Sequence, residues 1–359
     1  MRIRAIPIIV AIMASSAPST EAAQPVRHGV VFYEEDRFAG WPANNGIWSW
    51  GDDIVVGFTL SFHKDKDGGH PIDSDRPSGP MQGRSLDGGE TWTIETPSYL
   101  DETGAERAAV VLDSAFDFST PGFAARFRNG RFYFSEDRCR SWSGPFSLPT
   151  LGRKGLLART DYIVNGKHDL MAFIATEKDG GGEGWPTCIR TTDGGKTWRQ
   201  AGWIGEQPPA GYGYAIMPST VRLDSGALLS MIRRGGVVDG TKRWWLEAFM
   251  SPDDGERWYM LEQPRIDNEG NPASMITLRD GRIALTYGHR GAPYGIRARI
   301  SADQGVSWSN EIVLRDDGGG LDLGYPQTVQ RRDGKCVTVY YFNDGTQKER
   351  YIAFTIWQP

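Results

Sequence analysis

A short segment that recurs along the chain limits the fold more than any other feature of the sequence. Good copies are Ser85–Trp92, Thr191–Trp198, Ser251–Trp258 and Ser301–Trp308, and a fifth copy, Ser135–Trp142, has lost its glycine. The first residues of successive copies are 50, 56, 60 and 50 positions apart. A repeat of this length indicates a ring or array of similar supersecondary units.

The residues of the repeat suit a tight turn. Asp and Ser side chains can accept hydrogen bonds from the free backbone N–H groups of a turn, and Gly supplies a positive φ. The closing Trp is large enough to pack between neighbouring sheets. We therefore interpret each copy as a structural hairpin turn with a Trp wedge, and not as a binding site.

Strand-like runs between the repeats predict the fold. Runs such as Leu228–Ile232 and Ile283–Tyr287 follow Gly-containing turns, which are strong hairpin signals. Six such units predict an all-β protein, a six-bladed β-propeller with four-stranded antiparallel blades. The unit at residues 116–134 is irregular, so the sequence also allows a seventh blade in this region. The run His28–Tyr33 has no unit of its own, so we expect it to complete the last blade and close the ring.

Residues 1–23 differ from the rest of the chain. Arg2 and Arg4 precede the apolar run Ala5–Met13, and small residues follow up to Ala23. This pattern is typical of a secretory signal peptide and is too short to span a membrane. We expect export to the periplasm or the medium, no membrane anchor, and one propeller domain over residues 24–359. The net charge of −5 argues against a nucleic-acid partner, and three cysteines without metal-type spacing predict core thiols.

The order of the strands predicts which residues meet. We name the strands of a blade A to D from the centre outward. The A–B and C–D turns then share one face of the ring, and the starts of strands A and the B–C loops share the other, where ligands bind around the central opening. The strand A starts supply Asn45, Arg159, Asp161, Tyr214 and Tyr325, and the strand B ends and B–C loops supply His63, His70, Asp73, Arg233, His289, Arg290 and Arg297.

With these repeats and this set, the chain resembles the sialidase superfamily of six-bladed Asp-box propellers over almost all of its mature length. The resemblance implies three arginines on a substrate carboxylate, a Tyr–Glu pair that supplies the nucleophile, and an Asp as acid/base. The segment Gly324-Tyr325-Pro326 is similar to the nucleophile segment. The resemblance places one arginine after the strand-turn-strand of blade four, at Arg233 or Arg234. It places another arginine ahead of the last Asp-box, at Arg290 or Arg297, and the acid/base at Asp73.

Two parts of the sialidase pattern are absent from the sequence. The Glu partner of the nucleophile is expected where the chain has Met217-Pro218-Ser219. The first arginine is expected where it has Asn44-Asn45-Gly46-Ile47-Trp48. A Tyr without its base is a poor nucleophile unless it is activated.

The first of three functions that the sequence leaves open is an exo-acting glycoside hydrolase on an acidic or modified sugar. Tyr325 would be the nucleophile, Asp73 or Asp161 the acid/base, and Arg233 and Arg290 the carboxylate ligands. Arg159, Tyr214, His289, Arg297 and Asn45 are further candidates for substrate contact.

The second function is a polysaccharide lyase acting next to a uronic acid. Arg159 or Arg233 would neutralise the carboxylate and His63 or His70 would be the base. The acid would be Tyr162, Tyr214 or Tyr325. The third function is a non-catalytic glycan-binding propeller. All three take a glycan or oligosaccharide as partner and need no cofactor or metal; the sugar, its linkage and the oligomeric state stay open.

Overall fold

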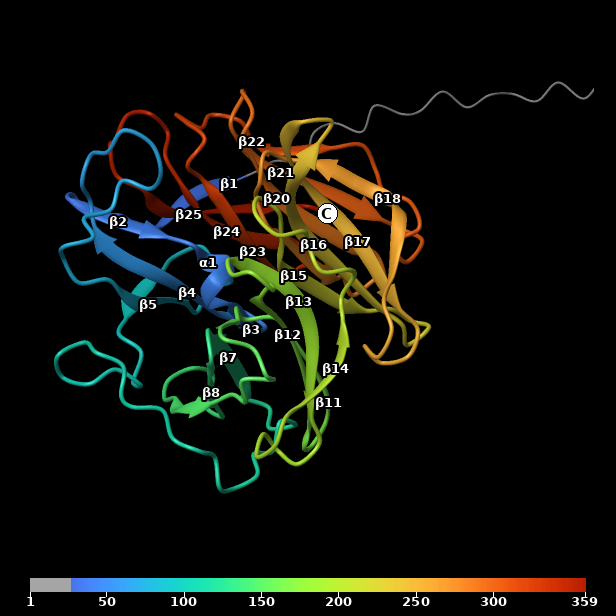
Figure 1. Cartoon of the computed structure of the whole chain (residues 1–359). Helices are drawn as coiled ribbons and strands as arrows, with labels where there is room; N and C mark the ends of the chain where they lie inside the picture. Colours follow the sequence, from blue (N-terminus) through green and yellow to red (C-terminus); the bar gives the residue numbers. More distant parts are fainter. Residues whose placement is uncertain (1–26) are drawn as a thin grey trace, which may run out of the picture.

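Six β-sheets surround a central axis in a computed structural model that describes residues 27–359 (Figure 1). The predicted propeller with antiparallel blades is confirmed, and the number of blades is six. The predicted signal peptide lies outside the described residues. Between residues 27 and 359, no helix has the length and apolar character needed to cross a membrane.

The first three blades differ from four strands each. Blade one comprises β2 (Arg37–Gly40), β3 (Ile47–Trp50), β4 (Asp53–Phe62), β5 (Gly79–Ser85) and β6 (Thr93–Glu95), with α1 (Pro42–Asn45) between β2 and β3. Blade two comprises β7 (Ala124–Arg128), β8 (Arg131–Ser135) and β9 (Ser143–Ser147). Blade three comprises β10 (Leu156–Leu157), β11 (Tyr162–Gly166), β12 (Asp169–Glu177), β13 (Glu183–Thr191) and β14 (Arg199–Trp203).

The last three blades are regular and four-stranded. Blade four comprises β15 (Tyr214–Arg222), β16 (Leu228–Val238), β17 (Thr241–Ser251) and β18 (Tyr259–Asp267). Blade five comprises β19 (Ala273–Thr277), β20 (Ile283–His289), β21 (Gly295–Ser301) and β22 (Ile312–Arg315). Blade six comprises β23 (Gly324–Gln330), β24 (Cys336–Phe342), β25 (Tyr351–Trp357) and β1 (Arg27–Phe32).

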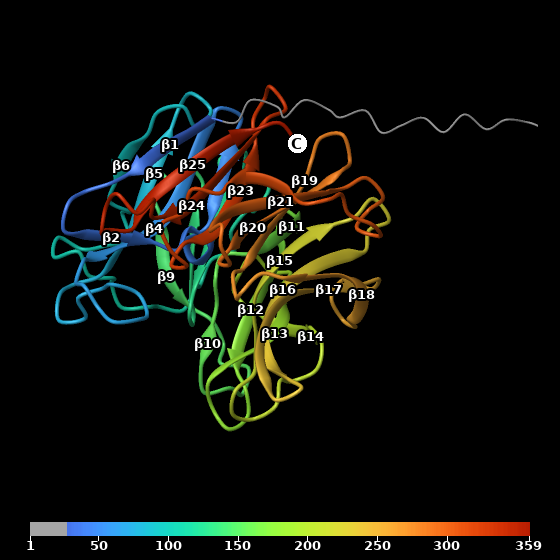
Figure 2. The same cartoon turned by 90° about the horizontal axis from the view of Figure 1, so that it is seen from above.

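The two ends of the described chain close the ring. β1 pairs antiparallel with β25, with Arg27 opposite Ile356 and Val30 opposite Ala353. In Figure 2 the blue β1 lies beside the red β25. The expectation that the first strand completes the last blade is therefore confirmed.

The repeated turns have the hydrogen bonds that their residues predicted. In the first copy, the Ser85 hydroxyl accepts the Gly89 N–H at 2.7 Å, and Asp87 accepts the Thr91 N–H at 2.9 Å. The Trp92 indole donates to the Gly89 carbonyl at 3.1 Å. In the copy without glycine, Cys139 takes the corresponding place with φ 61°. The repeats are thus structural, as interpreted.

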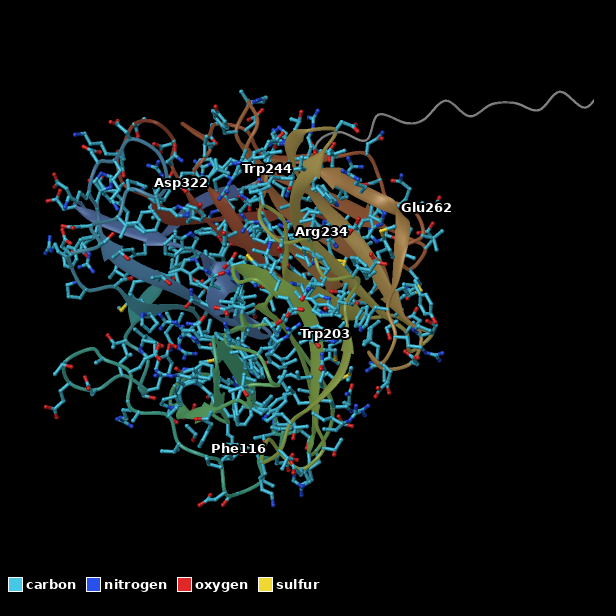
Figure 3. All side chains as sticks on the ribbon, viewed as in Figure 1. Phe116, Trp203, Arg234, Trp244, Glu262 and Asp322 are labelled. Carbon is cyan, nitrogen blue, oxygen red and sulfur yellow. The ribbon has the colours of Figure 1, made fainter. Side chains whose placement is uncertain are left out.

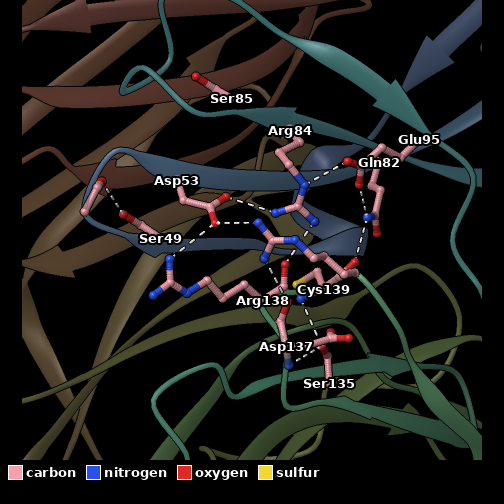
Figure 4. A network of polar contacts seen from close by, with 12 residues as sticks. Ser49, Asp53, Gln82, Arg84, Ser85, Glu95, Ser135, Asp137, Arg138 and Cys139 are labelled. Atoms are coloured by element: carbon pink, nitrogen blue, oxygen red, sulfur yellow. Dashed lines mark hydrogen bonds and ion pairs between the residues drawn. The ribbon is translucent and has the colours of Figure 1, made fainter.

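Blades one and two are joined near the repeated turns by a polar network, shown in Figure 4. The Arg84 guanidinium donates to Asp53 at 2.9 Å and to Glu95 at 2.8 Å. It also donates to the Arg138 carbonyl of blade two at 3.0 Å. Because Arg84 and Asp53 are buried, their ion pair within blade one is protected from solvent screening, and Arg84 joins blade two through the Arg138 carbonyl.

Two features of the inner strands were not predicted. In blade one, strand A starts at Arg37, and α1 divides it into β2 and β3, which both pair with β4. Blade two has only three strands, because residues 96–123 run outside it without forming a strand. The three cysteines are free and buried, as expected of core thiols.

Candidate functional site

Tyr325 lies at the centre of the ring because β23 is irregular at this residue. The register of β23 against β24 shifts between Gly324 and Gln327, and Tyr325 has φ 50°, which a non-glycine residue rarely adopts. The Tyr325 N–H donates to the Asn271 side chain at 2.8 Å, which holds the strained backbone in place. The bulge aims the ring of Tyr325 at arginines from other blades.

Arg233 of β16 makes the principal contact to Tyr325. Its Nη1 donates to the Tyr325 hydroxyl at 2.8 Å, and the same nitrogen lies 3.7 Å from the sulfur of Met217. The guanidinium also lies 5.3 Å from the ring centre of Tyr214. Arg233 and Tyr214 are therefore both in the central cluster.

Arg290 completes the cluster from blade five. Its guanidinium lies 5.7 Å from the ring centre of Tyr325 and donates to the Tyr341 hydroxyl at 2.9 Å. Within residues 27–359, neither Arg233 nor Arg290 forms an ion pair with a carboxylate. Two partly buried arginines without an internal counter-ion leave positive charge for a ligand. Arg159 differs, because it donates to Asn44 at 2.8 Å and pairs with Glu183 at 3.1 Å.

The arginines change the acidity of Tyr325. Burial alone would raise the pKa of its hydroxyl, but the charges of Arg233, Arg290 and Arg159 prevail and lower the pKa below its usual value of 10. By contrast, burial raises the pKa of Tyr214. Tyr325 is therefore the tyrosine of the cluster whose phenolate is stabilised.

His70 reaches the edge of the cluster through Asp322. His70 Nδ1 lies 2.7 Å from Asp322 Oδ1, and the Tyr341 hydroxyl donates to the same oxygen at 2.8 Å. Arg350 donates to the other oxygen at 3.1 Å. Burial would raise the pKa of Asp322, but His70, Tyr341 and Arg350 outweigh burial and lower it. A carboxylate on Nδ1 fixes the orientation of an imidazole and leaves Nε2 for proton transfer.

Asp161 lines a cavity of about 330 Å³ along the inner strands, together with Arg159, Met217 and Thr328. Oδ1 accepts the Thr220 N–H at 3.4 Å, whereas Oδ2 is buried without a hydrogen-bond partner in the described structure. Burial raises the pKa of Asp161 to about 8. Asp161 therefore carries a proton at neutral pH, as a general acid must.

Five of the predicted site residues lie elsewhere, and two of them are held inside blades. Asn45 is buried, accepts from Arg126 at 2.6 Å and donates to the Trp41 carbonyl at 3.0 Å. Arg297 is buried and bonded to Glu311 at 3.1 Å and to the Pro293 carbonyl at 3.0 Å. The polar atoms of both residues therefore join elements of the fold.

His63 and Asp73 lie in the segment between β4 and β5, and His289 is the last residue of β20. His63 contacts Asp65 at 3.1 Å, and Asp73 contacts Lys64 at 3.2 Å. Backbone and Lys64 hydrogen bonds lower the pKa of Asp73, so it is ionised at neutral pH. His289 Nδ1 lies 3.8 Å from Glu269.

Asp322 and Tyr341 were missed by sequence reasoning. Tyr341 lies in the apolar run of β24, a pattern that does not indicate a site residue. Asp322 lies two positions before β23, so a carboxylate just ahead of an inner strand was the available signal. Among residues 27–359, no group of three or more His, Cys, Asp or Glu residues is arranged to hold a metal ion.

The fold and the cluster define a class: a six-bladed Asp-box propeller with a Tyr–Arg centre. Residues 115–338 match the BNR repeat-like domain, which is more than half of the chain. The protein therefore belongs to the BNR repeat-like family. No curated protein sequence matches the chain.

Solved structures share the fold at low sequence identity. A protein of unknown function from Dyadobacter fermentans is 21% identical with a TM-score of 0.68, covering 92% of this chain and 98% of that one. The NanB sialidase of Streptococcus pneumoniae is 13% identical with a TM-score of 0.58, covering 91% and 70%. The α-L-arabinanase of Penicillium chrysogenum is 14% identical with a TM-score of 0.56, covering 89% and 96%.

Proposed function

We propose that the protein is an exported carbohydrate-active enzyme, a sialidase-like exo-glycosidase that acts on a carboxylate-bearing sugar of a glycan. The observation that carries the proposal is the contact of 2.8 Å between the Tyr325 hydroxyl and Arg233, beside Arg290. The arginines would bind the sugar carboxylate while their charge keeps Tyr325 acidic. The fold that the chain shares with a sialidase and an arabinanase supports a glycan-active propeller.

In this reaction the Tyr325 phenolate, which forms when the hydroxyl proton passes to solvent, attacks the anomeric carbon and the bond to the leaving oxygen breaks. The leaving oxygen needs a proton, which Asp161 holds at neutral pH and Asp73 does not. Water then gives a proton to the ionised Asp161 and attacks the anomeric carbon, so the sugar is released and Tyr325 leaves as the phenolate. The arginine charge activates Tyr325 in place of the Glu partner that sialidases use, because Met217 stands at that position.

A second candidate function is a lyase acting next to a uronic acid. The contact between His70 and Asp322 at 2.7 Å favours it, because an oriented imidazole is a suitable base for a sugar C–H proton. Arg233 or Arg290 would neutralise the uronate, and Tyr325 would protonate the leaving oxygen.

The test is incubation of the protein with sialosides and with uronate-containing oligosaccharides. New reducing ends and the ultraviolet absorbance of an unsaturated uronate are followed together. New ends without absorbance are expected of a hydrolase, and both signals together would establish the lyase. Tyr325→Phe is expected to lower the rate by a factor on the order of 10³ or more. Tyr33→Phe is the matched control, because Tyr33 is exposed on the outer rim. Equal rates for Tyr325→Phe and the wild type would contradict the proposal.

A further inference from the structure

A second groove lies between blades three and four and shares no lining residue with the central cluster. It has a volume of about 640 Å³ and is lined by residues of both blades. Trp203 and Glu206 come from blade three, and Arg234, Glu247 and Tyr259 from blade four. We call it the Trp203 groove. Figure 3 shows Trp203 and Arg234 on this side of the ring and Asp322 across from them.

Its aromatic wall is rigid. The ring of Trp203 stacks on Trp185 with 3.7 Å between the ring centres and an angle of 12°. The Trp185 indole donates to the Gly205 carbonyl at 3.0 Å, which fixes the stack. Trp203 lines the groove and Trp185 does not, and the Arg153 guanidinium lies 5.0 Å from the ring centre of Trp203 and 5.3 Å from that of Trp185. Tyr259, with 53% of its surface exposed, adds a second aromatic side chain. A flat aromatic surface of this kind suits the C–H face of a sugar ring.

The polar groups of the groove are built into the blade and are not mobile surface charges. Arg234 Nη1 pairs with Glu247 at 3.0 Å, and both side chains are less than one-fifth exposed. Arg234 Nε is buried and has no hydrogen-bond partner in the described structure. Arg234 and Glu247 both line the groove, so the pair places guanidinium N–H donors beside a carboxylate acceptor, which matches neighbouring hydroxyl groups.

The charge of the Trp203 groove disfavours the carboxylate-bearing sugar that is proposed to bind at the central cluster. Glu206 and Glu247 outnumber Arg234, so an anionic sugar would be repelled here. In the centre, Arg233 and Arg290 lack carboxylate partners within residues 27–359 and attract one. The two places thus suit different sugar units.

We propose that the Trp203 groove binds a neutral saccharide, with a ring stacked on Trp203 and hydroxyl groups on Arg234 and Glu247. The choice of a saccharide rests on the proposed function, since a glycan-active enzyme meets neutral sugars next to its acidic target. Binding in the groove requires no cleavage.

The experiment measures saccharide binding directly by saturation-transfer NMR. The probes are neutral arabino-, xylo- and cello-oligosaccharides and, in parallel, glucuronate oligomers. Neutral probes are expected to bind the wild type and Tyr325→Phe equally. Trp203→Ala and Glu247→Gln are expected to weaken binding at least tenfold, and Tyr33→Ala, which removes an exposed aromatic ring elsewhere, to leave it unchanged. Thermal unfolding of each variant shows that it is folded.

The outcomes separate this inference from the proposed function. Binding of neutral probes by a protein that cleaves no glycan would support saccharide binding in the Trp203 groove and contradict the proposed glycosidase activity. Cleavage with no binding of neutral probes, or binding unchanged in folded Trp203→Ala, would overturn the groove. Glucuronate oligomers that bind in the groove in preference to neutral ones would overturn it as well.

Discussion

Met217 of blade four occupies the place that Tyr325 occupies in blade six. Each residue has a left-handed φ, 54° for Met217 and 50° for Tyr325, and each lies where strand A shifts register against strand B. Each also precedes a proline, which has no N–H to donate at the interrupted ladder. Both side chains reach Arg233. Arg233 therefore lies between the Tyr325 hydroxyl and the Met217 thioether. Met217 stands where the resemblance to sialidases implies a Glu carboxylate.

Replacing Met217 by Glu is predicted to raise the pKa of Tyr325. A carboxylate beside Arg233 would neutralise the charge that stabilises the phenolate and would repel the phenolate itself. The expected increase is roughly one pKa unit or more, measured as tyrosinate absorbance against pH, with Tyr325→Phe used to assign the signal. Met217→Gln is the matched control, since it changes size and polarity without adding charge. The same titration curve for both variants would contradict this account of Tyr325.

Replacing Arg233 by Gln is predicted to weaken carboxylate ligands selectively. Arg233 has no carboxylate partner within residues 27–359, so its charge is available to a ligand. Loss of one charge-assisted contact should reduce the affinity for a sugar acid by about 10- to 100-fold and leave the affinity for its neutral analogue unchanged. Calorimetric titration with glucuronate and with glucose checks this. The exposed Arg332→Gln is the control, and a similar loss in that variant would point to long-range charge instead.

Replacing Asp322 by Asn is predicted to destabilise the fold. Asp322 contacts His70 and accepts from Tyr341 and Arg350, and its loss would leave the Arg350 guanidinium without its carboxylate counter-ion and the buried Tyr341 hydroxyl without its acceptor. The expected cost is about 2–4 kcal/mol in the free energy of unfolding. Because its pKa is lowered, the stabilisation is complete above the ordinary carboxyl pKa of 3.8 and is lost as the pH falls through the lower folded value. Urea unfolding near neutral pH tests the cost, and the exposed Asp75→Asn should show almost none.

The regular half of the ring was predictable because its signals are local. A repeated turn motif and Gly-containing turns report hydrogen bonds between residues close in sequence, so blades four to six follow from the sequence. The centre of blade six also follows, and Tyr325 lies where the repeat placed it. The division of the first inner strand by α1 has no such signal, since α1 is only four residues long and is held by tertiary contacts.

The details of the site depend on register, which the sequence does not specify. Arg233 and Arg234 are neighbours in β16 and therefore point to opposite faces of the blade. The register of β15 against β16 shifts between Ile216 and Ser219, and this shift decides which of the two arginines points to the centre of the ring. The shift is a property of the paired strands and cannot be seen in either strand alone. The contact of His70 with Asp322 joins residues 252 positions apart and requires the closed ring.

Replacing Asp161 by Asn is predicted to change how stability depends on pH. The folded pKa of about 8 lies above the ordinary value of 3.8, so the unfolded chain loses the proton first as the pH rises. The wild type should therefore lose stability between about pH 4 and pH 8 and show no further loss from this group at higher pH. Asn keeps the acceptor for Thr220 and cannot ionise, so the variant should lack this loss.

The difference between the two proteins is expected to be small near pH 4 and to reach roughly 2–5 kcal/mol in favour of Asp161→Asn near pH 9. Urea unfolding at the two pH values measures it, and Asp75→Asn should follow the wild type at both. If Asp161 is also the general acid, Asp161→Asn should lose activity while it gains stability, which a purely structural residue would not do. Unchanged activity together with the stability gain would remove Asp161 from the reaction and leave the proton to His70.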